Sequence, residues 1–110
     1  MTTPRFDELI HAPSRLSLVA FLAATAWADF AVLRDSVGLS DSTLSKALTT
    51  LEDAGYVEIR KAFVGKRPRT SARLTTSGRT AFDQHVLALQ EIVARAGGSV
   101  VPPSRSSEQS

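Results

Sequence analysis

Apolar residues in the first part of the chain repeat at the spacing of helices. Phe6, Leu9 and Ile10 predict a short helical segment. From Leu16 to Ala24 the sequence is apolar almost throughout, which predicts a central buried helix. This helix is expected to begin at Pro13, because proline fits the first helical turn without losing a hydrogen bond.

A second full helix is predicted from Asp29 to about Ser36. Asp29 can cap its first turn, and Gly38 can end it in a left-handed turn. Its inward-facing residues lie three and four positions apart and are Phe30, Leu33 and Val37.

The third helix, over about 41–54, has two contrasting faces. Ser40 or Asp41 can accept hydrogen bonds from the first turn, and Gly55 ends the helix. A stripe that can dock on the core consists of Leu44, Ala47, Leu48 and Leu51. The opposite face is polar and carries Ser42, Thr43, Ser45, Lys46 and Thr49.

Residues 56–63 alternate in the manner of a strand, and 70–74 resume it after a loop at 64–69. Val57, Ile59, Lys61 and Phe63 share one side of the first strand, and this side is mostly apolar. The two strands therefore predict a hairpin with a basic loop that contains Lys66, Arg67 and Arg69.

A long closing helix follows, with Thr76 or Ser77 as its cap. Its apolar seam, at spacings of four and three, is Phe82, Val86, Leu89, Val93 and Ala96, widened by Leu87 and Ile92. Such a helix can pack on its own core or pair with a second copy, and we favour the homodimer. Residues 97–110 are rich in Gly, Ser and Pro and are expected to be a disordered tail after a single domain at 1–96.

Charge changes the picture more than composition does. The net charge is only +2, yet residues 56–80 contain seven basic side chains and one acidic side chain. This concentration favours contact with a polyanion over a strand pair that is merely protected by charges at its edge. The neighbouring helix points the same way, because short hydroxyls and one lysine allow close approach to bases and phosphates, although a plain polar surface is the alternative for that face alone.

Three blocks of this sequence resemble successive blocks of small MarR-type and ArsR-type winged-helix regulators. They are HAPSRLSLVAFLA at 11–23, LSDSTLSKALTTLEDAGYV at 39–57 and LTTSGR at 74–79. The resemblance implies an α+β winged helix-turn-helix fold, with a three-helix core, a two-stranded wing and a long C-terminal helix. It also implies sequence-specific binding of double-stranded DNA and a role in transcription regulation.

The resemblance places the third helix in the major groove, with Ser42, Ser45 and Lys46 at the usual contacting positions. The hairpin at 63–73 would be the wing, and its loop at 64–69 would lie on phosphates or in the minor groove. Asp41 departs from the neutral residue common at its position, so a capping role suits it better.

Some ArsR-type proteins bind zinc through Asp-x-His on the closing helix and a second His pair about ten residues later. Asp83-Gln84-His85 matches the first half, but no second pair exists, so we predict no metal and no cofactor. His85 is interpreted as a surface or interface residue, and His11 as a structural one.

Other functions fit the sequence less well. No phosphate loop, cysteine nucleophile or plausible catalytic constellation is visible, so we predict that the chain is not an enzyme. A protein-interaction module or antirepressor is the main alternative, but it would not need the basic wing. An unidentified small-molecule effector could bind between the closing helix and the core, with Trp27 and Phe82 as walls. The lack of cysteine, of a signal segment and of a membrane span predicts a cytoplasmic protein with no membrane partner.

Overall fold

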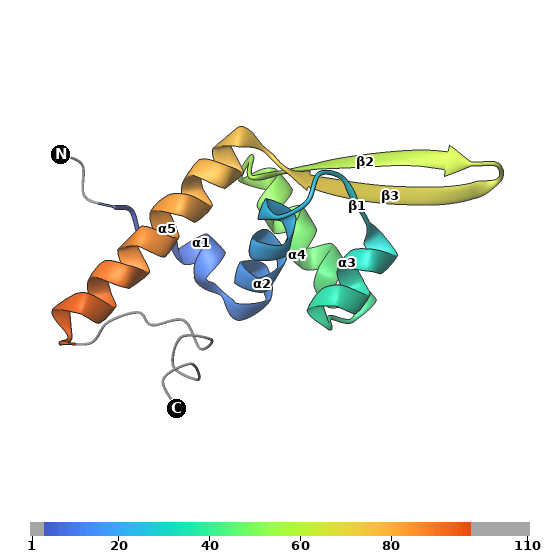
Figure 1. Cartoon of the computed structure of the whole chain (residues 1–110). Coiled ribbons are helices and arrows are strands. Elements are labelled where there is room, and N and C mark those ends of the chain that lie inside the picture. The colour runs from blue at the N-terminus through green and yellow to red at the C-terminus, as the bar shows by residue number, and fades with distance from the viewer. Residues whose placement is uncertain (1–3, 98–110) are drawn as a thin grey trace, which may run out of the picture.

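The computed structural model describes residues 4–97 and confirms the predicted winged helix-turn-helix class. Five helices and three strands follow one another along the chain (Figure 1). In order they are α1 (Glu8–His11), α2 (Pro13–Ala23), β1 (Ala28–Asp29), α3 (Phe30–Val37), α4 (Asp41–Asp53), β2 (Val57–Val64), β3 (Arg67–Leu74) and α5 (Thr76–Arg95). Apart from Gly97, the predicted disordered tail lies outside the described residues.

The core lies where α2, α3, α4 and the base of the sheet meet. The predicted stripe of α4 is confirmed, since all four of its residues are buried. It packs with residues of the other elements, namely Leu18, Val19, Leu22, Ala28, Leu33, Val57, Ala72 and Leu74. Periodicity therefore predicted the face that holds α4 on the domain.

The sheet has one more strand than the sequence predicted. The two residues of β1 pair with Ala72 and Ser71 of β3, so the strand order is β1-β3-β2. A strand of two residues leaves no periodic pattern to detect, and its pairing depends on residues more than 40 positions away. This pairing ties the start of α3 to the base of the wing.

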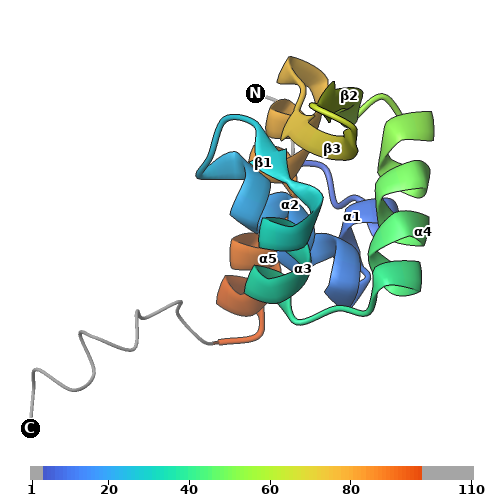
Figure 2. The same ribbon diagram turned by 90° about the vertical axis from the view of Figure 1, so that its right-hand side faces the viewer.

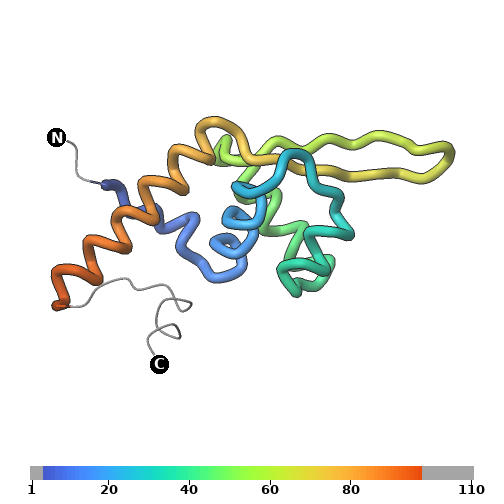
Figure 3. The backbone as a smooth tube through the Cα atoms, viewed as in Figure 1, coloured from blue at the N-terminus to red at the C-terminus, as the bar shows by residue number. Residues whose placement is uncertain are grey.

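The predicted loop at 64–69 is mostly strand. The antiparallel register runs from Val57 opposite Leu74 to Val64 opposite Arg67, which leaves a turn of two residues. Gly65, at φ 66°, takes the first turn position, which favours glycine in two-residue hairpins. Pro68 is opposite Phe63, one pair beyond the turn, where a strand residue donates no hydrogen bond to its neighbour. The hairpin therefore extends far from the core as a paired ribbon (Figures 1 and 3).

The start of α5 is also shifted from the prediction. Thr75, rather than Thr76 or Ser77, caps the helix by accepting from the Gly78 N–H at 3.0 Å. The same hydroxyl donates to the Gly55 carbonyl oxygen at 2.7 Å. A Cβ at Gly78 would collide with the carbonyl oxygen of Tyr56, so only glycine allows this close approach between α5 and the end of α4.

Candidate nucleic-acid interface

The polar face of α4 is exposed as predicted. Ser42, Thr43, Ser45, Lys46 and Thr49 all lie opposite the buried stripe and are open to solvent. Figure 2 shows α4 along one side of the molecule, and Figure 1 shows the hairpin projecting beyond α3 and α4. Both predicted parts of the interface therefore belong to one end of the molecule.

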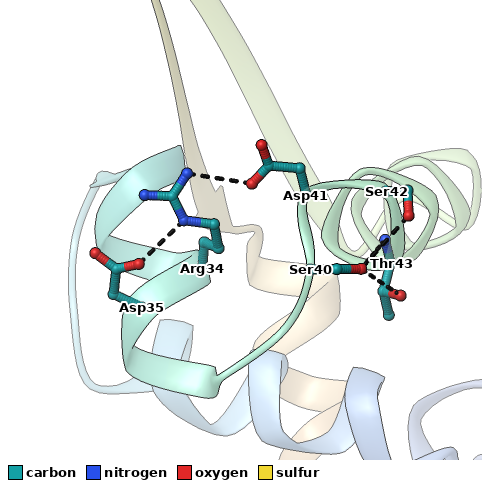
Figure 4. A network of polar contacts seen from close by, with 6 residues as sticks. All are labelled: Arg34, Asp35, Ser40, Asp41, Ser42 and Thr43. Atoms are coloured by element: carbon teal, nitrogen blue, oxygen red, sulfur yellow. Dashed lines mark hydrogen bonds and ion pairs between the residues drawn. The ribbon is translucent and has the colours of Figure 1, made fainter.

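The turn between α3 and α4 is held by a small polar network (Figure 4). Ser40 caps α4 by accepting from the Thr43 N–H at 3.2 Å, and its hydroxyl donates to the Thr43 Oγ1 at 2.9 Å. Asp41 does not make the cap; its carboxylate pairs with the Arg34 guanidinium at 3.2 Å. Arg34 also pairs with Asp35 at 3.0 Å, so one cation links the two helices of the motif.

This network divides the predicted contacts of α4 into two groups. The Ser42 and Thr43 hydroxyls lie within 3.4 Å of the Ser40 hydroxyl and take part in its capping cluster. Within the described residues, Ser45, Lys46 and Thr49 have no side-chain hydrogen bond or ion pair. These three side chains are exposed and have no partner within the described residues, whereas Ser42 and Thr43 are exposed but contact Ser40.

An open groove of about 500 Å³ separates α4 from the hairpin. Ser45 and Thr49 form part of one wall, and Lys61 of β2 forms part of the other. The remaining lining residues are Phe30, Leu48, Glu52, Ile59 and Thr70. Lys61 was not among the predicted contacts, although it lies inside the basic segment, because only the register of the hairpin brings it opposite α4.

Two ion pairs and two contacts between an arginine and Trp27 lie at the base of the hairpin. Arg69 pairs with Asp29 at 3.0 Å, and Arg73 pairs with Glu58 at 2.8 Å. The guanidinium of Arg60 lies 3.9 Å from the ring centroid of Trp27, and that of Arg73 lies 4.8 Å from it. Several of the basic residues therefore orient the wing, as well as adding to its charge.

The expectation for Asp29 was wrong. Asp29 makes no capping hydrogen bond to α3; it pairs with Arg69 and accepts from the Ser71 hydroxyl at 3.2 Å. Trp27 contacts two wing arginines, and its suggested role as a wall of an effector site stays a prediction. Residues distant in sequence compete for both side chains, which a local pattern cannot reveal.

The tip of the hairpin differs from its base. Lys66 and Arg67 are exposed, and no acidic side chain among residues 4–97 pairs with either. Phe63 is 74% exposed, so the predicted inward side of β2 is covered only near Val57 and Ile59; Val64, on the opposite side, is 56% exposed. β2 extends beyond the core, and its alternation of apolar and polar residues continues in the part that no other element of the described chain covers.

A second polar cluster joins the N-terminal segment to α5. His85 is fully buried, which corrects its interpretation as a surface residue. Its Nδ1 accepts from the Asp7 N–H at 3.0 Å, so the proton of the neutral ring is on Nε2, which lies 3.2 Å from the Nδ1 of His11. Burial, and then the neighbouring His11, lower the pKa of His85.

Asp7 also accepts from the Tyr56 hydroxyl at 2.6 Å, and this hydrogen bond together with burial raises the pKa of Tyr56. The carboxylate of Asp7 further caps α1. The described residues contain no group of three His, Cys, Asp or Glu side chains placed to hold a metal ion. The hydrogen bonds of Asp7 with His85 and Tyr56 join the N-terminal segment to α5 and to the residues that precede β2.

Comparison with known proteins fits this geometry. Residues 14–93 match the family profile described as winged helix DNA-binding domain, which is more than half of the 110 residues. The chain belongs to this family. Within the described part of this winged helix domain, no helix is both long and apolar enough to cross a membrane.

An uncharacterised protein of Methanocaldococcus jannaschii is 26% identical over 85 residues, which cover 77% of this winged helix chain and 92% of the relative. A transcriptional regulator homologue from Pyrococcus horikoshii has a similar structure, with a TM-score of 0.76, 23% identity and coverage of 82% of this chain and 89% of that one. The PcaV transcriptional regulator from Streptomyces coelicolor gives a TM-score of 0.68, 19% identity and coverage of 93% and 70%. Other structural neighbours are MarR-family regulators, so the fold is the MarR-type winged helix.

Proposed function

We propose that this chain is a sequence-specific, duplex-DNA-binding transcriptional regulator. In this proposal the helix at about 41–54 enters the major groove, and the wing at 64–69 lies on phosphates or in the minor groove. The observation that carries the proposal is the groove between α4 and the hairpin. Short hydroxyls of Ser45 and Thr49 line one side, Lys61 lines the other, and Lys66 and Arg67 continue beyond it.

The chemistry of these two walls suits a duplex. Hydroxyl side chains hydrogen-bond to base edges and phosphates without holding the helix away from the groove. Lysine and arginine side chains neutralise phosphates and release counterions. The concentration of cations on the wing also favours DNA over a protein partner, because a protein-interaction module needs no array of cations at this end.

We also propose that the chain acts as a homodimer through α5. One face of α5 packs on its own domain, where His85 and Ala88 are buried. Other positions of the helix expose apolar side chains to solvent: Leu87 at 46%, Ile92 at 45% and Val93 at 38%. The predicted interface residues Phe82, Val86 and Leu89 are half-buried in the domain. Only the exposed part of each side chain would contact a second copy. A two-fold pair matches a palindromic operator.

A small-molecule effector is a further part of this proposal. Among the neighbours, NadR was solved with 4-hydroxyphenylacetate, and DNA binding by BpsR is regulated by 6-hydroxynicotinic acid. Both ligands are aromatic carboxylic acids. In this chain a cavity of about 590 Å³ lies between the N-terminal segment and α5, and Arg5, Tyr56 and Thr80 are among its lining residues. The carboxylate of such a ligand would pair with Arg5. The ligand would then contact the N-terminal segment, whose Asp7 is hydrogen-bonded to His85.

Selection of bound duplexes from a random pool, with the full chain, tests the proposal. We expect a palindromic site, whose affinity falls steeply with salt. Changing Lys66, Arg67 and Arg69 together to Ala should flatten the slope of log affinity against log salt by up to about 5 in a dimer. The share due to Arg69 should be smaller, because Asp29 already neutralises it.

Arg95→Ala is the control, since it removes a cation from the far end of α5. Affinity of the triple variant should fall for every sequence, with only a mild loss of preference. Unchanged affinity of the triple variant at two salt concentrations would favour a protein-interaction module instead.

A further inference from the structure

The outer end of the wing carries an apolar group that its charge does not explain. Phe63 and Val64 are exposed, and Pro68 lies directly across from Phe63 on the neighbouring strand. Single exposed apolar residues are ordinary on protein surfaces. Phe63, however, lies near the end of a protruding hairpin, within a few residues of Lys66 and Arg67.

The register of the hairpin shows which way Phe63 faces. Residues directly opposite each other in an antiparallel pair lie on the same face of the sheet. The buried pair of Val57 and Leu74 begins one face, and every second pair outward belongs to it. The next pairs on that face end with Lys61 opposite Thr70, which line the groove beside α4, and then Phe63 opposite Pro68. The apolar pair therefore continues the face that lines the proposed DNA groove.

The hairpin presents this pair in a fixed position. Its two strands are paired along their full length, and the turn has only two residues. The ion pair of Arg69 with Asp29 holds the hairpin to the domain, and the ion pair of Arg73 with Glu58 joins its two strands. An exposed phenylalanine on such a support loses little conformational freedom when it is buried by a partner.

We propose that Phe63, backed by Pro68, acts as a wedge that inserts into the minor groove and unstacks one base step, while Lys66 and Arg67 hold the adjacent phosphates. This inference rests on the proposed function. The flanking cations commit the wedge to a polyanion, and proteins that bind the minor groove insert Phe or Pro between base steps and bend the duplex by roughly 20–90°. Pyrimidine–purine steps unstack most easily, so the wedge would favour a TA or CA step under each wing without any hydrogen bond to a base.

The test compares three full-length variants on the duplex selected by the unmodified chain. Bending is measured by energy transfer between dyes at the two DNA ends, and unstacking by the fluorescence of 2-aminopurine placed at the step under the wing. We expect Phe63→Ala to lose the bend, the fluorescence rise and the preference for TA over a rigid A-tract, with about a tenfold loss of affinity for the TA duplex. Phe63→Leu should retain much of all three, since leucine also serves as a wedge.

Val64→Ala is the matched control, because Val64 lies at the same end of the hairpin on its opposite face. It should leave bending and preference unchanged. Equal bending by the unmodified chain and Phe63→Ala would overturn the wedge and leave the regulator standing. A chain that selects no duplex would overturn both proposals. If sedimentation instead shows that Phe63→Ala converts a dimer into a monomer, Phe63 contacts a second copy of the chain. That result would also overturn the wedge.

Discussion

The exposed residues at the two ends of the molecule differ in kind. At the end formed by α4 and the hairpin, the exposed side chains are mainly hydroxyls and cations, with apolar groups only at the tip. On α5, the exposed side chains include Leu87, Ile92 and Val93. Both α4 and α5 bury one face on the same domain, so their uncovered faces carry the difference. One suits a hydrated polyanion, and the other suits a protein surface.

Charge placed on the apolar face of α5 should have the largest effect. Changing Ile92 and Val93 together to Glu would bring like charges close to each other across a two-fold interface, which costs several kcal/mol. We expect sedimentation to show a dimer for the unmodified chain and a monomer for this variant, with an unchanged melting profile of the domain. Gln90→Glu adds charge at another exposed position of α5 and should remain dimeric.

A monomer of the unmodified chain at tens of micromolar would contradict the proposed assembly. Point changes are preferable here to truncation after Arg79. Such a truncation would also remove His85 and Ala88, which are buried within the domain, so loss of the dimer could not be separated from loss of the fold.

The face of α4 should show a smaller, more specific effect. Changing Ser45 or Lys46 to Ala should cost about 1 to 3 kcal/mol of specific binding if the side chain contacts a base, with little change in stability because both are exposed. Leu48→Ala, on the buried face of the same helix, should instead cost about 2 to 5 kcal/mol of unfolding free energy. Binding and thermal melting separate the two. A double variant of Ser45 and Lys46 with the parent's sequence preference would show that α4 does not read bases.

Much of this architecture could be predicted because it depends on local patterns. The stripe of α4, the ends of α3 and the basic segment are all visible within a few residues of sequence. The exceptions have a common cause. Asp29 has the right type and position for a cap, but Arg69 and Ser71, 40 and 42 residues later, take its carboxylate oxygens. The sequence identified side chains that could contact DNA or cap a helix. Contacts with residues distant in sequence decided which of these side chains already have a partner within the domain.

The hairpin shows the same limit. Gly65 and Pro68 were interpreted as signs of a loop; Gly65 does lie in the two-residue turn, but Pro68 is part of the strand pair once the register is known. His85 was interpreted as a surface or interface residue because the second half of a zinc motif is absent, and nothing near it in sequence indicates Asp7 or His11 as partners. In the candidate site the clearest example is Lys61, because only the register of the hairpin brings it opposite α4.

The cluster around His85, at the α5 end of the molecule, predicts that the stability of the fold depends on pH. The pKa of His85 is lowered in the folded protein, so the unfolded chain binds the proton more readily. Stability should therefore be complete above the unfolded value of about 6.5 and fall as the pH drops below it, until the lowered pKa is passed. Protonation would also turn Nδ1 into a donor facing the Asp7 N–H.

Thermal melting between pH 7.5 and pH 5 measures this effect. His85→Asn retains an acceptor for the Asp7 N–H and cannot titrate, so its melting temperature should change less over the same interval. Equal slopes for the parent and this variant would assign the acid sensitivity to other groups. DNA binding at constant ionic strength should follow the fraction folded, because the DNA end contains no histidine.

The smallest expected effect concerns Arg69, which belongs both to the fastening of the wing and to its charge. An exposed ion pair contributes at most about 1 kcal/mol, so Asp29→Asn should barely change the melting temperature. The asparagine keeps an oxygen acceptor for the Ser71 hydroxyl, and it frees the guanidinium of Arg69. Binding to any duplex should tighten at low salt, and the salt slope should steepen by up to about 0.9 per subunit. An unchanged slope in Asp29→Asn, together with normal binding by Arg69→Ala, would make Arg69 a fastening of the hairpin alone and leave DNA contact to Lys66 and Arg67.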